Sequence, residues 1–83
     1  MTMNTKEKVI TVLAGLSGVP TVTEEDTLSE SLGLDSLSHA LMILELEDAF
    51  EIQFKEADMN PFDLITVADV IALVERYVGG QNE

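Results

Sequence analysis

The stretch Gly33-Leu34-Asp35-Ser36-Leu37 decides how the rest of the chain is organised, because it places a hydroxyl at the start of a helix. Asp35 is a favourable N-cap residue, and a run of apolar and acidic residues continues from it to Glu51. We therefore expect Ser36 in the first helical turn, where backbone N–H groups lack intrahelical partners and the helix dipole is positive. An anionic group on the Ser36 oxygen is favoured at such a position. Ser36 is predicted to be an attachment point.

The helix predicted from Ser36 to Glu51 has two apolar stripes when its residues are placed at about 100° per position. The first stripe runs along the whole helix, as burial in a core requires, and consists of Met42, Ile43, Leu46, Ala49 and Phe50. The second stripe lies on the opposite face of the N-terminal half and consists of Leu37, Ala40, Leu41 and Leu44. We call this second set the docking stripe. An apolar patch beside acidic residues favours a partner site, and packing under the neighbouring loop is the alternative.

Upstream of this helix, the sequence predicts a first helix from about Asn4 to Leu16, where Asn4 and Glu7 fit a capping box. A long polar loop follows, from Ser17 to about Asp35. So long a loop in a small domain needs apolar anchors, and three leucines are available for this. The anchors are Leu28, Leu32 and Leu34.

Downstream, one short helical turn is expected at residues 55–59. Thr66 and Asp69 fit a second capping-box-like start, so a last helix is expected to begin there and to stop at Gly79-Gly80. No convincing strand pattern is present. The predicted fold class is therefore all-α, a small four-helix bundle with three main helices and one short helix. Residues 1–83 are expected to form a single small domain, ordered over about residues 4–78, with a flexible tail at 79–83.

Composition excludes several function classes. Sixteen acidic residues against four basic ones give a formal charge of −12, which disfavours nucleic acids and anionic membrane surfaces and favours basic protein surfaces as partners. The chain has no cysteine, no apolar run long enough to span a membrane and no secretory leader pattern, so we expect a cytoplasmic, monomeric protein. Between Lys8 and Lys55 there is no Lys or Arg at all.

The sequence gives little support for catalysis or metal binding. His39 lies three residues after Ser36, but the stretch lacks the second glycine of a nucleophile elbow and an evident orienting acid. We predict no catalytic residue and interpret His39 as a half-buried residue near the mouth of a core cleft. No calcium-loop pattern is present, and the acidic residues of the 36–51 helix are interpreted as a solvated face, so no metal site is predicted.

The segment Leu32-Gly33-Leu34-Asp35-Ser36-Leu37, followed by a helix ending in Phe50, resembles the carrier-site signature of acyl carrier proteins. The resemblance extends over roughly residues 6–77 and implies that family's four-helix fold. It also implies that Ser36, flanked by Asp35 and Leu37, carries 4′-phosphopantetheine through a phosphodiester. The thiol at the far end of that arm holds acyl groups as thioesters, so the resemblance implies a carrier rather than an enzyme.

The resemblance further implies partners: a phosphopantetheinyl transferase, and acyl-loading, condensing or modifying enzymes with basic docking surfaces. The docking stripe is the expected apolar centre of that contact. Its expected charged surround is Glu45, Glu47, Asp48 and Glu51.

Two positions depart from the pattern of carriers in primary fatty acid synthesis. Those carriers usually have acidic residues where this chain has Ser38 and Leu41. This difference favours a specialised pathway for polyketides, mixed peptides or unusual fatty acids. The alternatives are a peptidyl or aminoacyl carrier, which Asp35 disfavours, and an acidic helical adaptor without a prosthetic group.

Overall fold

Three α-helices and one short 3-10 helix make up the chain in a computed structural model that describes residues 4–60 and 62–81. The elements are α1 (Thr5–Ser17), α2 (Ser36–Phe50), η1 (Glu56–Met59) and α3 (Val67–Gln81). Across the described residues no strand forms, and extended pairing is limited to an isolated bridge between Thr27 and Thr66. The predicted all-α fold with three main helices and one short helix is confirmed.

Local capping fixes both ends of α1. The Asn4 side chain accepts a hydrogen bond from the Glu7 N–H at 2.8 Å, and the Glu7 carboxylate accepts one from the Asn4 N–H at 3.3 Å. This reciprocal pair is the predicted capping box. Gly18 ends the helix with φ 76°, in the left-handed region that glycine adopts without steric cost.

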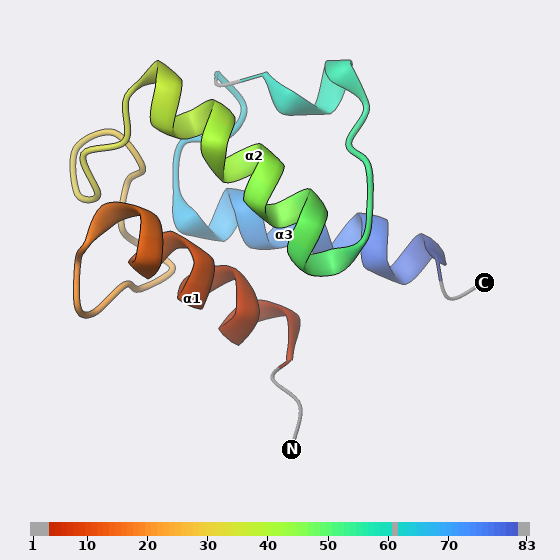
Figure 1. Cartoon of the computed structure of the whole chain (residues 1–83), viewed down its shortest axis with the longest axis horizontal. Helices are drawn as coiled ribbons and strands as arrows, with labels where there is room; N and C mark the ends of the chain where they lie inside the picture. The colour runs from red at the N-terminus through yellow and green to blue at the C-terminus, as the bar shows by residue number, and fades with distance from the viewer. Residues whose placement is uncertain (1–3, 61, 82–83) are drawn as a thin grey trace.

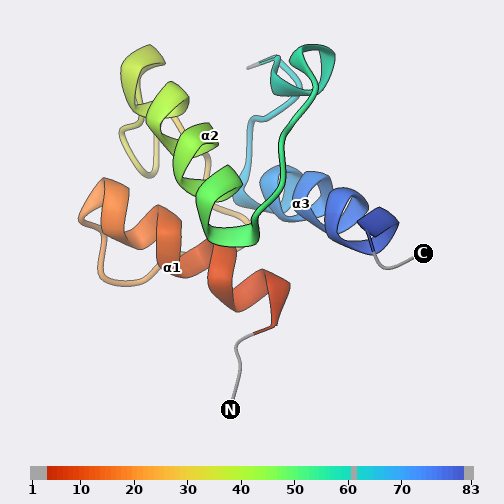
Figure 2. The same cartoon turned by 45° about the vertical axis from the view of Figure 1, so that its right-hand side comes forward.

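The core lies where the inner faces of the three helices meet. Figure 1 shows α1 beside α2 with α3 behind α2, Figure 2 shows α3 to the right of both, and α1 contacts both of the other helices. The side chains with no more than trace exposure are Val9 and Leu13 of α1, Met42 and Leu46 of α2, and Val67, Val70 and Val74 of α3. The predicted core stripe of α2 is therefore buried at Met42, Ile43 and Leu46, while Ala49 and Phe50 are half-buried.

The long loop between α1 and α2 is held by its leucines and by the start of α3. Leu28, Leu32 and Leu34 are all buried, as predicted. The Leu28 N–H donates to the Ile65 carbonyl, and the Val67 N–H donates to the Asp26 carbonyl, both at 2.9 Å. These bonds bring the residues that precede α2 close to those that precede α3.

The connection between α2 and α3 is fixed by Tyr77. The Tyr77 hydroxyl accepts a hydrogen bond from the Lys55 N–H at 2.8 Å and donates one to the Asp58 carboxylate at 2.5 Å. Its ring packs edge-to-face on Phe54 with centroids 4.9 Å apart. Burial, and then the bond to Asp58, raise the pKa of Tyr77 above its ordinary value. The segment carrying η1 is thereby held against α3.

The end of α3 differs from the sequence-based prediction. The helix does not stop at Gly79-Gly80 but continues to Gln81. Glycine lowers helix propensity by about 1 kcal/mol relative to alanine but does not forbid the helical conformation. The predicted helix end at Gly79-Gly80 is therefore wrong, the flexibility predicted for the tail at 79–83 stays a prediction, and residues 82–83 lie outside the described part of the chain.

Candidate functional site

Ser36 is the first residue of α2, and its side chain is exposed. Asp35 is the N-cap, and its Oδ1 accepts a hydrogen bond from the Ser38 N–H at 2.9 Å. Gly33, with φ 67°, turns the chain into this cap in a conformation that disfavours residues with a Cβ. The Leu34 N–H donates to the Leu28 carbonyl at 2.8 Å, so the approach to Ser36 is tied to the loop. The predicted placement of Ser36 in the first turn is confirmed.

The carboxylate of Asp35 is stabilised in its charged form by the start of α2. Hydrogen bonds from the Ser38 backbone N–H, and after it from the Ser38 side chain, hold the pKa of Asp35 below its usual value. The cap therefore stays ionised at neutral pH and fixes the direction in which α2 begins. Ser36 is presented to solvent by a rigid turn rather than by a free loop.

The docking stripe lies on the outside of α2. Leu37 is 72% exposed, Leu44 61% and Leu41 45%, and Ala40 is exposed as well. The alternative expectation, that the long loop covers this stripe, is wrong. The loop instead packs its leucines into the core. Three large apolar side chains therefore face solvent along the N-terminal half of α2.

Glu47 differs from the other acidic residues predicted to surround this stripe. Glu45, Asp48 and Glu51 are exposed. Glu47 is half-buried, and its carboxylate accepts a hydrogen bond from the Phe54 N–H at 2.9 Å. Glu47 thus holds the segment that follows α2 against the helix. Helical periodicity does not predict this role, because Phe54 lies seven residues further on in irregular structure.

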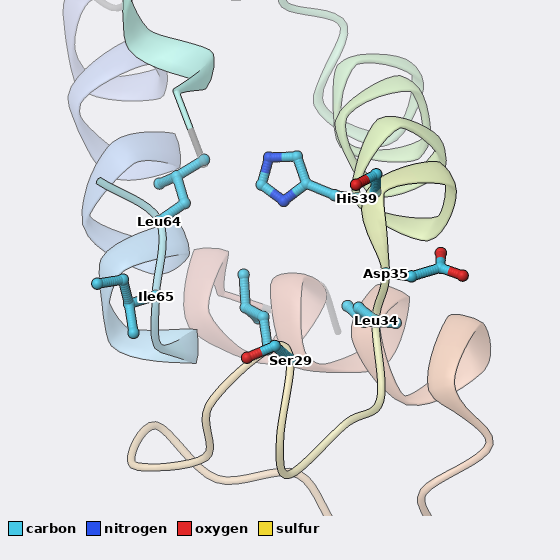
Figure 3. A pocket seen from close by; sticks show the side chains of 8 residues that line it. Ser29, Leu34, Asp35, His39, Leu64 and Ile65 are labelled. Carbon is cyan, nitrogen blue, oxygen red and sulfur yellow. The ribbon is translucent and has the colours of Figure 1, made fainter. Parts of the chain in front are cut away.

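A cavity of about 430 Å³ opens beside Ser36, between the start of α2, the long loop and the residues before α3. It is lined by Leu28, Ser29, Leu34, Asp35, Ser36, His39, Leu64 and Ile65. Figure 3 shows the His39 ring extending from α2 towards Leu64 on the opposite wall. The Nε2 atom of His39 is buried and has no hydrogen-bond partner. The interpretation of His39 as a half-buried residue beside a cleft agrees with this position.

The far wall of the cavity was not predicted. Leu64 and Ile65 lie about thirty residues after Ser36, and Ser29 lies in the loop before it. Side-chain periodicity identifies the faces of one helix, but it does not say which distant segment faces them. The only signal in the sequence was the set of leucine anchors in the loop, of which Leu28 and Leu34 reach the cavity.

The part of the chain that the structure describes offers neither a metal cluster nor a membrane-spanning helix. In residues 4–60 and 62–81, no three His, Cys, Asp or Glu side chains converge to hold a metal ion. None of the helices described is long and apolar enough to cross a membrane.

Comparison with known families and proteins gives consistent matches. A family model described as a phosphopantetheine attachment site matches residues 7–74. An acyl carrier protein of an Exiguobacterium species is 39% identical over 57 residues, which cover 69% of this chain and 70% of the relative. The acyl carrier protein of Akkermansia muciniphila is 32% identical over 76 residues, 89% of this chain and 92% of the relative.

Two further matches extend over nearly whole chains. The D-alanyl carrier protein of Leuconostoc citreum is 35% identical over 78 residues, which cover 93% of this chain and all of the relative. A solved structure from Mycobacterium tuberculosis, assigned as an acyl carrier protein, superposes with a TM-score of 0.79 at 28% identity. That superposition covers 88% of this chain and 97% of the other.

Proposed function

The chain belongs to the acyl carrier protein family, whose covalent prosthetic group is 4′-phosphopantetheine, and we propose that Ser36 is the residue that carries this group. One observation supports this assignment above the others. Ser36 presents an exposed hydroxyl at the first position of α2, inside the matched attachment region. The prosthetic group supplies a thiol on which acyl groups are held as thioesters.

The residues around Ser36 suit a phosphodiester. The first turn of α2 offers the positive end of the helix dipole, which favours an anion. Asp35 caps the turn from its own side and keeps α2 in a fixed direction, so the attached arm starts from a defined point. Because Ser36 is exposed, a modifying enzyme can reach its hydroxyl without unfolding the site.

We assign the docking stripe, with Asp35, Glu45, Asp48 and Glu51 around it, as the surface that partner enzymes contact. Exposed leucines provide an apolar centre, and the acidic residues provide a rim that attracts basic surfaces. The partners are a phosphopantetheinyl transferase and the enzymes that load, condense or modify the cargo. Weak, charge-steered contacts suit a carrier that must visit several enzymes in turn.

The pathway is proposed to be specialised rather than primary fatty acid synthesis. Ser38 and Leu41 give the surface beside Ser36 fewer charges and more apolar area than such a carrier is expected to have, and Leu41 is 45% exposed. A second candidate is an aminoacyl carrier. The similarity to a D-alanyl carrier protein over the whole length of that relative favours this candidate.

The attachment site is tested by mass spectrometry of the apo protein incubated with a phosphopantetheinyl transferase and coenzyme A. The wild type is expected to gain the mass of one phosphopantetheine, and Ser36→Ala is expected to gain none, because the acceptor oxygen is gone. Ser38→Ala is the matched control, since it removes a hydroxyl two residues away in the same turn and should still be modified.

Two outcomes contradict the assignment. Modification of Ser36→Ala would place the arm on another residue. A wild-type protein that no broad-specificity transferase modifies would instead favour the adaptor without a prosthetic group.

A further inference from the structure

A second exposed apolar patch lies in the turn that precedes α3. Phe62 is 85% exposed, more than any leucine of the docking stripe, and Ile65 is 54% exposed. Between them Leu64 is buried and anchors the turn in the core. We call Phe62 and Ile65 the turn patch. Single exposed apolar residues are common on protein surfaces, but two large ones within four residues are typical of a contact surface.

The backbone under the turn patch is held by side chains on either side of it. The Phe62 N–H donates to Oδ1 of Asn60 at 2.9 Å, and the Asp63 N–H donates to the Asn60 carbonyl at 3.0 Å. The Ile65 N–H donates to the Asp69 carboxylate, also at 3.0 Å. Both residues of the patch therefore have a fixed backbone before any partner binds, which lowers the entropy cost of a contact.

The turn patch lies close to Ser36. Ile65 and Ser36 line the same cavity, so only the width of that cavity separates them. Phe62 precedes Ile65 by three residues, a separation of at most about 10 Å. Figures 1 and 2 show the segment before α3, drawn in teal to cyan, reaching the end of the molecule at which α2 begins. Ser36 therefore has the docking stripe on one side and, across the cavity, the turn patch on the other.

The position of this patch points to one kind of partner. A phosphopantetheinyl transferase must bring its active site to the Ser36 hydroxyl, whereas enzymes of the cargo act at the far end of the arm. Transient and standard protein interfaces bury roughly 600–800 Å² on each partner, and a circular patch of that size has a radius of about 14–16 Å. A contact centred on Ser36 therefore extends across the cavity to the turn patch. A second copy of this chain is disfavoured, because each copy carries a net charge of −12.

We propose that the turn patch is a second apolar contact for the phosphopantetheinyl transferase, and that Phe62 is the residue that anchors it. This inference rests on the proposed attachment at Ser36. Aromatic side chains are enriched in the buried centres of interfaces, where they fill apolar pockets. The transferase is therefore expected to offer an apolar pocket to Phe62 in addition to a basic surface for the acidic residues of α2. Phe62 touches no reacting atom, so it acts on KM rather than on kcat.

Steady-state kinetics of the transferase with apo variants test this contact. For Phe62→Ala, KM is expected to rise about 5- to 30-fold, as for the loss of an interface anchor, while kcat stays within about twofold of the wild type. Phe62→Leu keeps a large apolar side chain and should recover most of the wild-type affinity. Gln53→Ala is the matched control, because Gln53 is exposed in the same connection but lies just beyond the other end of α2. It should leave KM unchanged.

A probe at position 62 gives a direct readout. The chain has no tryptophan, so Phe62→Trp labelled with 5-fluorotryptophan gives a single ¹⁹F NMR signal. Saturating transferase is added without coenzyme A, so that no transfer occurs. The difference in chemical shift between H₂O and D₂O is expected to shrink, because the enzyme covers the ring. The same probe in Gln53→Trp should keep its difference.

Four results overturn the inference. A wild-type KM for Phe62→Ala, or an unchanged solvent effect on the probe at position 62, would remove Phe62 from the contact. Equal rises in KM for Phe62→Ala and Gln53→Ala would show a general effect of altering the connection. A lower kcat at constant KM would mean that Phe62 acts on the reaction. A melting temperature of Phe62→Ala far below that of the wild type would show that the ring supports the fold despite its exposure.

Failure of this inference is distinguishable from failure of the proposed function. If the wild type takes up phosphopantetheine on Ser36, and Phe62→Ala does so with the wild-type KM, only the second contact is wrong. If the wild type takes up no phosphopantetheine, the attachment site is wrong, and the turn patch loses the enzyme to which we assign it.

Discussion

Single carboxylates near the starts of α2 and α3 hold the two segments that border the cavity. Asp35 caps α2, and Asp69 accepts hydrogen bonds from the Ile65 and Thr66 N–H groups, both at 3.0 Å. The Thr66 hydroxyl in turn accepts a bond from the Asp69 N–H at 3.2 Å, which completes the reciprocal pair that the sequence predicts. The turn that carries Ile65 into the cavity wall therefore depends on the charge of one side chain.

Replacing that side chain, Asp69→Ala, is expected to lower the free energy of unfolding at neutral pH by about 1 kcal/mol, the usual cost of a lost helix cap. Hydrogen bonds, first of all from the Thr66 N–H, hold the pKa of Asp69 below its usual value. The contribution of Asp69 to the unfolding free energy is therefore complete above the ordinary pKa of an aspartate in the unfolded chain. It is lost as the pH falls through the lower pKa that Asp69 has in the folded protein. Urea unfolding of both proteins from pH 7 to acid measures this difference.

Asp63→Ala is the matched control because it removes an exposed carboxylate from the same segment. We expect it to change the unfolding free energy far less at neutral pH. A difference between wild type and Asp69→Ala that stays constant down to strongly acidic pH would mean that the Asp69 charge does not support the turn.

At the scale of elements, α2 has a buried apolar face and an exposed apolar face. Its inner face buries Met42 and Leu46, while its outer face exposes the docking stripe. Burial of the inner face fixes the rotation of the helix, so the outer leucines cannot turn inward without exposing the core. The exposed apolar area is therefore built into the fold rather than left over from poor packing.

A charge in this stripe is expected to weaken partner contact without unfolding the domain. For Leu41→Glu, the KM of a phosphopantetheinyl transferase for the apo protein should rise about tenfold, because an apolar contact is lost and a charge is placed at its centre. Ala72→Glu adds the same charge at an exposed position of α3 and should leave KM close to the wild-type value. Steady-state modification kinetics, with thermal melts of each variant, provide the comparison.

Equal KM values for Leu41→Glu and the wild type would remove α2 from the transferase contact. An equal rise in both variants would instead indicate a general charge effect. A melting temperature of Leu41→Glu far below that of the wild type would show that Leu41 supports the fold despite its exposure.

The features that sequence predicted well are local ones. The Asn4 and Glu7 pair, the Asp35 cap and the Thr66 and Asp69 pair each act within four residues, so the capping rules found all three helix starts. The end of α3 was missed because glycine only weakens a helix, and no proline or left-handed glycine is present to stop it. The starts of these helices are determined by specific capping side chains, whereas the end of α3 depends on smaller differences in free energy.

Contacts between residues far apart in the sequence could not be predicted from the sequence. Nothing in the spacing around Glu47 shows that its carboxylate receives the Phe54 N–H. The sequence placed Ser36 and His39 three residues apart, but not the opposite wall formed by Leu64 and Ile65. The position of Ser36 at the start of α2 was therefore predictable, while the cavity beside it required the folded chain.

For the whole molecule, the net charge of −12 governs how partners approach. The ion pair between Lys6 and Glu24, at 2.7 Å, involves side chains about half exposed and neutralises little of this charge. The stretch between Lys8 and Lys55 contains nine acidic residues and includes the whole of α2. An attractive field for basic enzymes therefore surrounds the residue that we propose to be modified.

Because this field is screened by salt, the kcat/KM of the transferase for the wild-type apo protein is expected to fall steeply as ionic strength rises. The Debye length shortens from about 10 Å at 0.1 M to about 3 Å at 1 M, and steering can account for a 10-fold or larger part of the association rate. Screening also reduces repulsion among the carboxylates, so the unfolding free energy of the carrier should rise over the same range. Because kcat/KM falls while the carrier becomes more stable, a loss of rate cannot come from unfolding of the carrier by salt.

The variants Glu45→Gln and Asp48→Gln test which charges steer the transferase. The kcat/KM for their apo forms should depend less on salt than that of the wild type, because both side chains are exposed beside the docking stripe. An identical salt dependence in these variants would show that the acidic rim of α2 does not guide its partners.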